Sequence, residues 1–198
     1  MCLLPDKRTR LLHDLAPWRA VVACALLASI VPSRQSAAAD PSPVSREYEI
    51  KAAFLYNFAK FIEWPAQSFP DANAPIVIGV LGDSPCAPAL ERLVKDRKIN
   101  SRAIAVRRVE SAQEASGTHL LFVDASEEAH FERLEPAIEA LPVVTVGESP
   151  SFVPAGGAIN FVLQGDNVRF EINMGAAGRA GVKISAQLLK LATAVRRS

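Results

Sequence analysis

Two short polar loops are the first places in this sequence where side chains could bind a ligand. Gly82-Asp83-Ser84 follows the apolar run 76–81, and Gly147-Glu148-Ser149 follows a shorter run at 142–146. If both runs are strands of an open α/β sheet, these loops lie at the strand ends, where such sheets bind ligands. We therefore take the loop residues as candidates for binding a small solute. Ordinary turn and helix-cap chemistry is the alternative interpretation.

The residue patterns of common enzyme sites do not occur in this sequence. It contains neither a P-loop nor a G-x-S-x-G nucleophile elbow. His119 and His130 have no cysteines or acidic cluster at a metal-binding spacing, and His13 lies in the N-terminal leader. The G-x-x-G-x-x-G run at 175–181 differs from the dinucleotide-binding fingerprint. We expect no catalytic residues, no metal and no cofactor.

The first 39 residues have the composition of a secretory signal peptide. Basic residues between positions 7 and 19 precede an uncharged apolar run at 20–31, and a polar stretch then leads to Ala37-Ala38-Ala39. This is the order of the n-region, the h-region and the small-residue cleavage site. The apolar run is shorter than the roughly 20 residues that a membrane span needs. The sequence predicts cleavage before Asp40 and export. An uncleaved membrane anchor and a lipoprotein modified at Cys24 are the alternatives.

The charge of the chain gives no indication of a nucleic-acid partner. The full sequence carries 22 basic and 21 acidic residues, and the part that follows the leader carries 17 and 19, a net charge of −2. Arg107-Arg108 and Arg196-Arg197 are isolated pairs, which are too few to neutralise a phosphate backbone. A partner recognised by this chain is therefore expected to be a protein or a small molecule.

Cys86 is the only cysteine in the sequence after the leader. An exported chain with one cysteine cannot close an internal disulfide, so we expect a free thiol and a core held together by burial. Cys86 also lies where a helix is predicted to begin, and a helix N-terminus lowers the pKa of a thiol. Burial of the thiol and an intermolecular bridge in a homodimer are the alternatives.

A long helix is predicted from about residue 45 to residue 64. Ser45 fits its N-cap, and Pro65 ends it. The apolar residues that share one face of this helix recur at helical spacing, and we expect them in the core; they are Ile50, Phe54, Phe58 and Phe61.

Three aromatic residues of the same segment have a polar atom on the ring. Tyr48 and Tyr56 fall off the predicted apolar face, and Trp64 lies at its end. Such side chains suit the wet edge of a core or a surface that binds a partner. Tyr48, Tyr56 and Trp64 are therefore the candidate partner-binding residues.

Strands alternate with helices through the middle of the chain. Strands are predicted at 76–81, 103–106, 119–123 and 142–146, and helices at 86–96 and 127–141. Two further strands, 158–163 and 168–172, flank a turn and form an antiparallel hairpin. A closing helix is predicted over 177–195, because apolar residues recur there at helical spacing. The pattern predicts an α/β protein, a single three-layer sandwich over 40–198, with a mostly parallel sheet, an antiparallel C-terminal hairpin and long helices at both ends.

Two long segments of this sequence resemble the ends of the YfiR-like family of periplasmic proteins. They are EYEIKAAFLYNFAKFIEWP at 47–65 and RFEINMGAAGRAGVKISAQLLKLA at 169–192. Between them IVIGVLGDSP, LLFVDAS, LPVVTVGES and GGAINFVLQGDNVRFEIN occur in the family's order. The resemblance covers about 46 to 192, almost all of the predicted mature chain.

The resemblance implies a function that composition and spacing do not. By this resemblance the chain is expected to be a non-enzymatic regulator which, like the namesake members, binds the periplasmic sensor domain of an inner-membrane diguanylate cyclase and holds it inactive. Such a regulator thereby lowers cyclic di-GMP and biofilm formation. An α/β sandwich and a homodimer are also implied. The family has no catalytic residues to transfer, and a periplasmic solute-binding protein is the alternative function.

One departure from the family concerns cysteine. The namesake members carry cysteines that form disulfides, whereas this chain keeps Cys86 alone after the leader. Redox control through an internal disulfide therefore does not transfer to this protein.

The leader gives a first testable prediction. We expect the mature protein to begin at Asp40 and to be recovered from the periplasmic fraction, because small residues precede that position. N-terminal sequencing of the purified protein measures this. A product that retains Met1, or one that sediments with membranes, would contradict the prediction.

Overall fold

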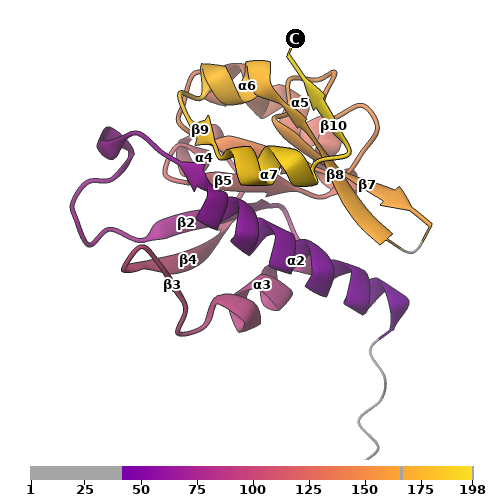
Figure 1. Cartoon of the computed structure of the whole chain (residues 1–198), viewed down its shortest axis with the longest axis horizontal. Coiled ribbons are helices and arrows are strands. Elements are labelled where there is room, and N and C mark those ends of the chain that lie inside the picture. The colour runs from indigo at the N-terminus through magenta and orange to yellow at the C-terminus, as the bar shows by residue number, and fades with distance from the viewer. Residues whose placement is uncertain (1–41, 166, 198) are drawn as a thin grey trace, which may run out of the picture. The chain divides into compact units, whose positions relative to one another are not determined.

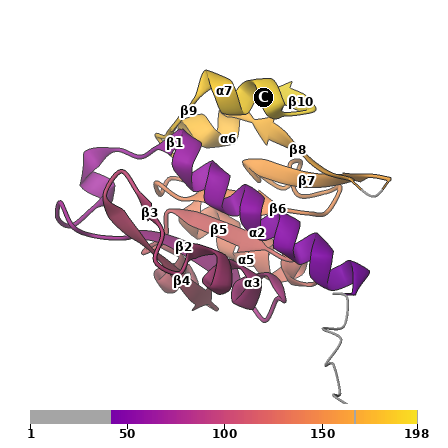
Figure 2. The ribbon, with the colours of Figure 1, turned by 60° about the horizontal axis from the view of Figure 1, so that its bottom comes forward.

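A sheet of eight strands, in the order β10-β8-β7-β6-β5-β2-β4-β3, forms the centre of the part that the structure describes (Figures 1 and 2). The computed structural model describes residues 42–165 and 167–197. From one edge to the other, the strands are β10 (Ala194–Arg196), β8 (Asn167–Asn173), β7 (Ile159–Gln164), β6 (Val144–Gly147), β5 (Leu120–Val123), β2 (Ile76–Leu81), β4 (Arg102–Val109) and β3 (Lys98–Ile99). The strands from β4 to β7 are mutually parallel, whereas the β7–β8 and β3–β4 pairs are antiparallel.

Helices cover both faces of this sheet, as a three-layer sandwich requires. Figure 1 shows α2 and α7 in front of the sheet and α5 behind it. One core cluster joins α2, α3, α6 and α7 to one face of the strands, and a second joins α4 and α5 to the other face. The helices are α2 (Pro43–Phe61), α3 (Cys86–Val94), α4 (Ala112–Ala115), α5 (Glu128–Ile138), α6 (Met174–Arg179) and α7 (Ala186–Leu191), with 3-10 turns η1 (Ala66–Ser68) and η2 (Ala125–Glu127). The predicted fold class is confirmed.

The opening helix α2 begins earlier than the sequence suggests. Ser42, not Ser45, is the N-cap: its side chain accepts the Ser45 N–H at 3.2 Å, and Pro43 fills the first helical turn without losing a hydrogen bond. The helix ends at Phe61 because the next residues, Ile62 and Glu63, form the strand β1, which pairs with β9 (Lys183–Ile184).

The buried stripe of α2 lies beside the predicted one. Its fully buried members are Lys51, Ala52, Leu55, Phe58 and Ala59. Of the predicted core residues, Phe58 is completely buried, whereas the other three flank the stripe and are half-buried. The Phe54 ring still packs on Phe161 and Phe170 of the β7–β8 hairpin, with centroid distances of 5.9 and 5.6 Å. The sequence pattern missed Leu55, which lies between the aromatic residues.

The predicted closing helix does not exist as one element. Residues 174–196 form α6, the short strand β9, helix α7 and strand β10. Gly181 has a φ of 66°, which ends the helical segment, and the Ser185 side chain caps a new helix by accepting the Leu188 N–H. Val195 is in β10, parallel to β8, and not on a helical face. Apolar spacing alone cannot distinguish one long helix from two short helices that a strand separates.

The β7–β8 hairpin is antiparallel as predicted, with Leu163 opposite Val168. Residue 166 of its turn lies outside the described residues, as does the leader up to residue 41. Within the described residues, no helix is long and apolar enough to cross a membrane.

The buried stripe of α2, as the structure places it, predicts that replacing two phenylalanines of this helix lowers the free energy of unfolding by different amounts. Phe58→Ala empties a fully buried site and is expected to lower the free energy of unfolding by about 3–5 kcal/mol. Phe54→Ala should cost clearly less, because its ring is half-exposed. Urea denaturation measures both, with Val44→Ala at an exposed site of the same helix as the control. Equal costs for the two phenylalanines would show that the stripe is wrongly placed.

Candidate functional site

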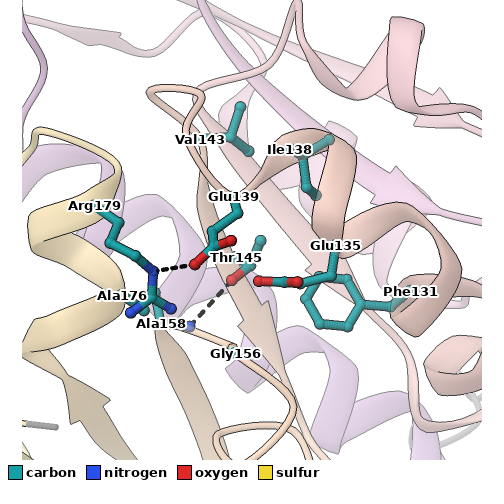
Figure 3. Close-up of a pocket in the computed structure, with 10 residues that line it drawn as sticks. All are labelled: Phe131, Glu135, Ile138, Glu139, Val143, Thr145, Gly156, Ala158, Ala176 and Arg179. Carbon is teal, nitrogen blue, oxygen red and sulfur yellow. Dashed lines mark hydrogen bonds and ion pairs between the residues drawn. The ribbon is translucent and has the colours of Figure 1, made fainter.

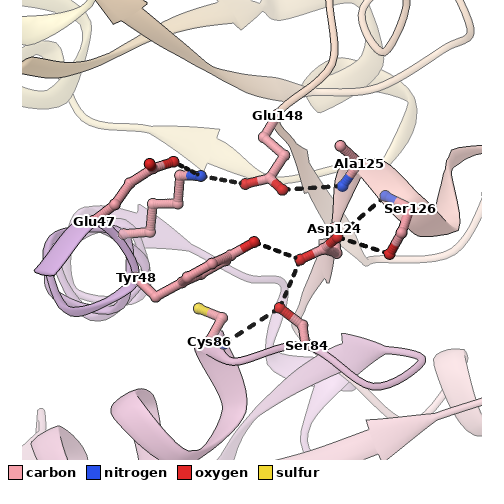
Figure 4. Close-up of polar contacts among 9 residues, drawn as sticks. Glu47, Tyr48, Ser84, Cys86, Asp124, Ala125, Ser126 and Glu148 are labelled. Atoms are coloured by element: carbon pink, nitrogen blue, oxygen red, sulfur yellow. Dashed lines mark hydrogen bonds and ion pairs between the residues drawn. The ribbon is translucent and has the colours of Figure 1, made fainter. Parts of the chain in front are cut away.

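The carboxyl ends of three parallel strands meet the N-terminal half of α2 in a network of polar side chains (Figure 4). Ser84 follows β2, Asp124 follows β5, and Glu148 follows β6. Helix α2 contributes Tyr48 and Lys51 from the turn that faces these strand ends. This is the place in the sheet where the sequence predicts a ligand site, and the protein's own side chains fill it.

Lys51 is the cation of the network, and its side chain is 4% exposed. Its ammonium group forms ion pairs with Glu47, one turn earlier in α2, and with Glu148. The other carboxylate oxygen of Glu148 accepts the Ala125 N–H at 3.0 Å. Burial alone would lower the pKa of Lys51, but the hydrogen bonds that its ammonium group donates to both carboxylates outweigh this effect and raise the pKa. Lys51 therefore stays charged and does not act as a base.

Asp124 is the acceptor at the centre of the second half of the network. It accepts hydrogen bonds from the Tyr48 hydroxyl at 2.9 Å and from Ser84 Oγ at 2.8 Å. Its other oxygen accepts from the N–H of Ser126 at 3.1 Å and from that residue's hydroxyl at 2.8 Å. Burial opposes the charge of Asp124, but these hydrogen bonds lower its pKa. Burial and the hydrogen bond to Asp124 raise the pKa of Tyr48.

The network has the chemistry of a structural clamp. Every nucleophile-type atom in it already has a partner: Ser84 Oγ donates to Asp124 and accepts the Cys86 N–H at 3.2 Å. The lysine is held protonated, and the tyrosine is held neutral. Within the described residues, no group of acidic, histidine or cysteine side chains could hold a metal ion. The arrangement fixes α2 to the strand ends, and the lowered pKa of Asp124 makes its carboxylate a weak base toward the Ser84 hydroxyl.

Cys86 lies at the start of α3 next to this network and is completely buried. Burial raises its thiol pKa to about 12; the Glu148 carboxylate adds to the effect, and Lys51 opposes it. The prediction that the helix N-terminus lowers the pKa of this thiol is therefore wrong, because desolvation of the thiolate is the larger effect.

The six loop residues predicted as a ligand site separate into different environments. Ser84 and Glu148 belong to the network. The Asp83 carboxylate is exposed and lies 3.8 Å from Arg108. Ser149 is buried. Gly82, at a φ of 68°, is a turn position, and Gly147 is the last residue of β6. A Cβ at these two positions would overlap the side chains of Glu127 and Phe152, respectively.

The sequence analysis missed four residues of the network, which are Lys51, Asp124, Glu47 and Ser126. Asp124 directly follows a predicted strand, so the rule that selected the other loops would also have selected it. Lys51 lies on the apolar side of α2, and a lone charge there indicates a buried ion pair.

The three aromatic candidates for partner binding are half-buried and make contacts within the chain. Tyr48 belongs to the network. The Trp64 indole N–H donates to the His119 carbonyl at 3.2 Å. The ring of Tyr56 packs under the guanidinium of Arg97, at 5.4 Å from the ring centroid. Their role in partner binding stays a prediction.

A second feature is a small cavity between α5, α6 and the sheet (Figure 3). Its volume is about 20 Å³, enough for about one water molecule. Glu139 and Arg179 form an ion pair of 2.7 Å across it. Burial and the neighbouring Glu139 raise the pKa of Glu135. The cavity is too small for a solute.

A comparison with protein families identifies the family of this chain. A family model described as YfiR/HmsC-like matches residues 48–193, which include most of α2, the network apart from Glu47, and the C-terminal hairpin. The chain belongs to the YfiR/HmsC-like family. This family consists of periplasmic proteins that regulate diguanylate cyclase signalling, and its role is regulatory rather than catalytic. No curated protein matches the sequence.

One solved structure supports the fold of this YfiR/HmsC-like chain, and a second shows a weaker likeness. A conserved domain protein from Vibrio cholerae O1 biovar El Tor aligns with a TM-score of 0.50 at 13% identity, over 75% of this chain and 60% of that one. The ABC domain from Streptococcus pneumoniae, solved in complex with L-Trp, aligns with a TM-score of 0.43 at 14% identity, over 60% of this chain and 54% of that one. The chain thus spans about 60% of the first structure's length.

The buried ion pairs predict a large effect of removing Lys51. Lys51→Met leaves Glu47 and Glu148 without their cation and is expected to destabilise the fold by about 3–5 kcal/mol. The double variant Lys51→Met/Glu148→Gln should recover part of this loss, since the buried charge is then gone. Urea denaturation measures both, and the exposed Lys60→Met is the control. A Lys51→Met protein as stable as wild type would show that the clamp contributes nothing.

The environment of Cys86 predicts a free but unreactive thiol. Because the thiol is buried and its pKa is raised to about 12, the native protein should not react with a maleimide at pH 8. Urea should expose the thiol and allow one label per chain. Mass spectrometry and non-reducing electrophoresis measure this. Rapid labelling of the folded protein, or a reducible dimer band, would contradict it.

Proposed function

We propose that this protein binds the periplasmic sensor domain of an inner-membrane diguanylate cyclase and holds the cyclase inactive. The observation that carries the proposal is the family match over residues 48–193. It includes the network that fixes α2, apart from Glu47, and the β7–β8 hairpin. The polar clamp at the strand ends supports a binding role, because its hydroxyl and amine groups are all engaged in structural contacts.

Repression requires that the protein bind one state of the cyclase better than the other. Equal affinity for both states shifts nothing, and a change from mostly active to mostly inactive needs a differential affinity on the order of 5 kcal/mol. A protein interface of standard size can supply this free energy when a few aromatic residues are buried in it. Tyr56 and Trp64 are the proposed anchors, because part of each ring stays exposed. Tyr48 is a weaker anchor, since its hydroxyl is bound to Asp124.

The alternative function, binding of a small solute at the strand ends, stays a prediction. A solute at Ser84 and Glu148 would have to displace Ser84 from Asp124 and Lys51 from Glu148. We therefore favour the regulatory function, in which the clamp holds the surface of α2 in one position.

Deletion of the gene tests the proposed function in the cell. We expect cyclic di-GMP and surface attachment to rise on deletion and to return when a complete copy is supplied. A copy that lacks residues 1–39 is the matched control and should not restore either level, since it stays in the cytoplasm. The cyclase should co-purify with the complete protein, and less of it with Tyr56→Ala. Unchanged cyclic di-GMP together with no co-purifying membrane protein would refute the proposal.

A further inference from the structure

One edge of the sheet is only partly covered. Strand β4 pairs with β2 along its inner side from Ile104 to Val109. On its outer side the short strand β3 pairs only with Arg102 and Ala103. Within the described residues, no strand pairs with the outer side of 104–109. Figure 2 shows β3 and β4 at this margin of the sheet.

The chain geometry explains why β3 stops so early. Ile99 pairs with Arg102, so Asn100 and Ser101 form a two-residue turn, with φ angles of 49° and 70°. This is the left-handed conformation that a type I′ hairpin needs. Asp96, with a φ of 61°, turns the chain from α3 into β3 just before the hairpin. The covering strand is therefore limited to two residues.

Every second residue of β4 directs its backbone N–H and C=O groups to the open side of the strand. Gly82 N–H donates to the Val109 carbonyl at 3.1 Å, so the backbone of Val109 faces β2. Backbone direction alternates along a strand, which turns the N–H and C=O groups of Ile104, Val106 and Arg108 outward. A strand placed alongside could bond to all three residues.

A groove runs beside this edge, between the end of α3 and β4. It has a volume of about 510 Å³, and its apolar floor includes Val94, Ile104 and Val106. Ile104 and Val106 are half-buried and lie on the same face of β4 as Arg108. Alternate apolar side chains of an added strand would fit this floor.

The rim of the groove and the open edge are rich in cations. Lys95, Arg97 and Lys98 line the groove together with the acidic residues Glu91 and Asp96, so its lining has one more cation than anion. Arg107 and Arg108 continue along the strand, and all five cations are exposed. Lys95 and Lys98 form no ion pair with any described residue. Arg108 is shared between Asp83 and Glu110, at 3.8 and 3.1 Å. These charges complement an acidic segment and oppose a basic one.

We propose that the outer side of β4 is a docking site for an extended, acidic segment of a partner protein, which adds to the sheet as a further strand. Main-chain hydrogen bonds to residues 104–108 would provide affinity, and alternate side chains would provide specificity. The segment would place apolar residues over Ile104 and Val106 and carboxylates near Lys98 and Arg107. This inference does not depend on the partner being a cyclase.

A second copy of this chain fits the same edge poorly. Two β4 strands paired antiparallel about a two-fold axis within 104–109 would bring Arg107 and Arg108 of both copies within a few residues of one another. Like charges on facing strands are destabilising. The cations thus discourage self-pairing while they admit an acidic strand.

The test uses the mature protein and a peptide of alternating valine and glutamate, about ten residues long. The matched probe replaces every glutamate by lysine. Val106→Pro removes an outward N–H that forms no bond in the structure, a change that edge strands tolerate. Val106→Thr keeps the N–H and the shape, and is its control. Lys98→Glu/Arg107→Glu reverses two exposed charges of the edge, and Arg133→Glu on α5 controls for charge reversal elsewhere.

We expect wild type, Val106→Thr and Arg133→Glu to bind the glutamate peptide more tightly than the lysine peptide by fluorescence anisotropy. Val106→Pro should bind the glutamate peptide roughly tenfold more weakly, because a peptide carbonyl loses its partner. The charge-reversed variant should bind the lysine peptide more tightly than the glutamate peptide. This reversal tests the proposal even if Val106→Pro unfolds. Equal binding of both peptides by wild type, or an unchanged preference in the charge-reversed variant, would overturn the proposal. A wild-type dimer that becomes monomeric in the charge-reversed variant would also overturn it, in favour of a second copy.

Discussion

The structure depends on one buried cation. Lys51 lies on the sheet-facing side of α2, where an unpaired charge would cost several kcal/mol, so it requires the carboxylates of Glu47 and Glu148. Glu148 in turn receives the Ala125 N–H and thereby connects the ends of β5 and β6. The position of the longest helix is set by these contacts together with the apolar stripe around Phe58. A hydrophobic stripe alone would allow α2 to slide or rotate over the sheet, whereas the ion pairs define its register.

The clamp determines which parts of the protein can bind a partner. The strand ends, which are open in many α/β proteins, are filled here by Tyr48 and Lys51 from α2. A partner of the kind proposed above would then contact the outer surface of the protein. A rigid α2 presents the exposed parts of Tyr56 and Trp64 in one arrangement, and the sheet presents the outer side of β4 at its margin. A surface that is already ordered loses little entropy on binding.

Periodicity and turn residues predict that the parallel strands, the hairpin and α2 exist, because these elements follow local rules, but they misplace the N-cap, the end and the buried stripe of α2. The prediction for residues 174–196 was wrong, because their apolar spacing fits one continuous helix. Only Gly181 and Ser185 indicate where that helix is interrupted. For the site, the loops after β2 and β6 were found by the strand-end rule, but the partners in α2 were not. Spacing does not reveal which helix covers a strand end, so the Lys51–Glu148 pair, 97 residues apart, needs the tertiary structure. The prediction of a lowered pKa for the Cys86 thiol was wrong for a related reason, because the burial of this side chain depends on contacts with residues distant in the sequence.

The central claim is that this protein binds a periplasmic sensor domain and thereby represses a cyclase. The most direct measurement is the synthesis of cyclic di-GMP by the cyclase reconstituted in liposomes, with its sensor domain outside and the mature protein added to that side. We predict a saturable decrease in the rate of synthesis, and no decrease when the protein is enclosed on the catalytic side. A rate that stays constant at saturating protein on the sensor side would contradict the account.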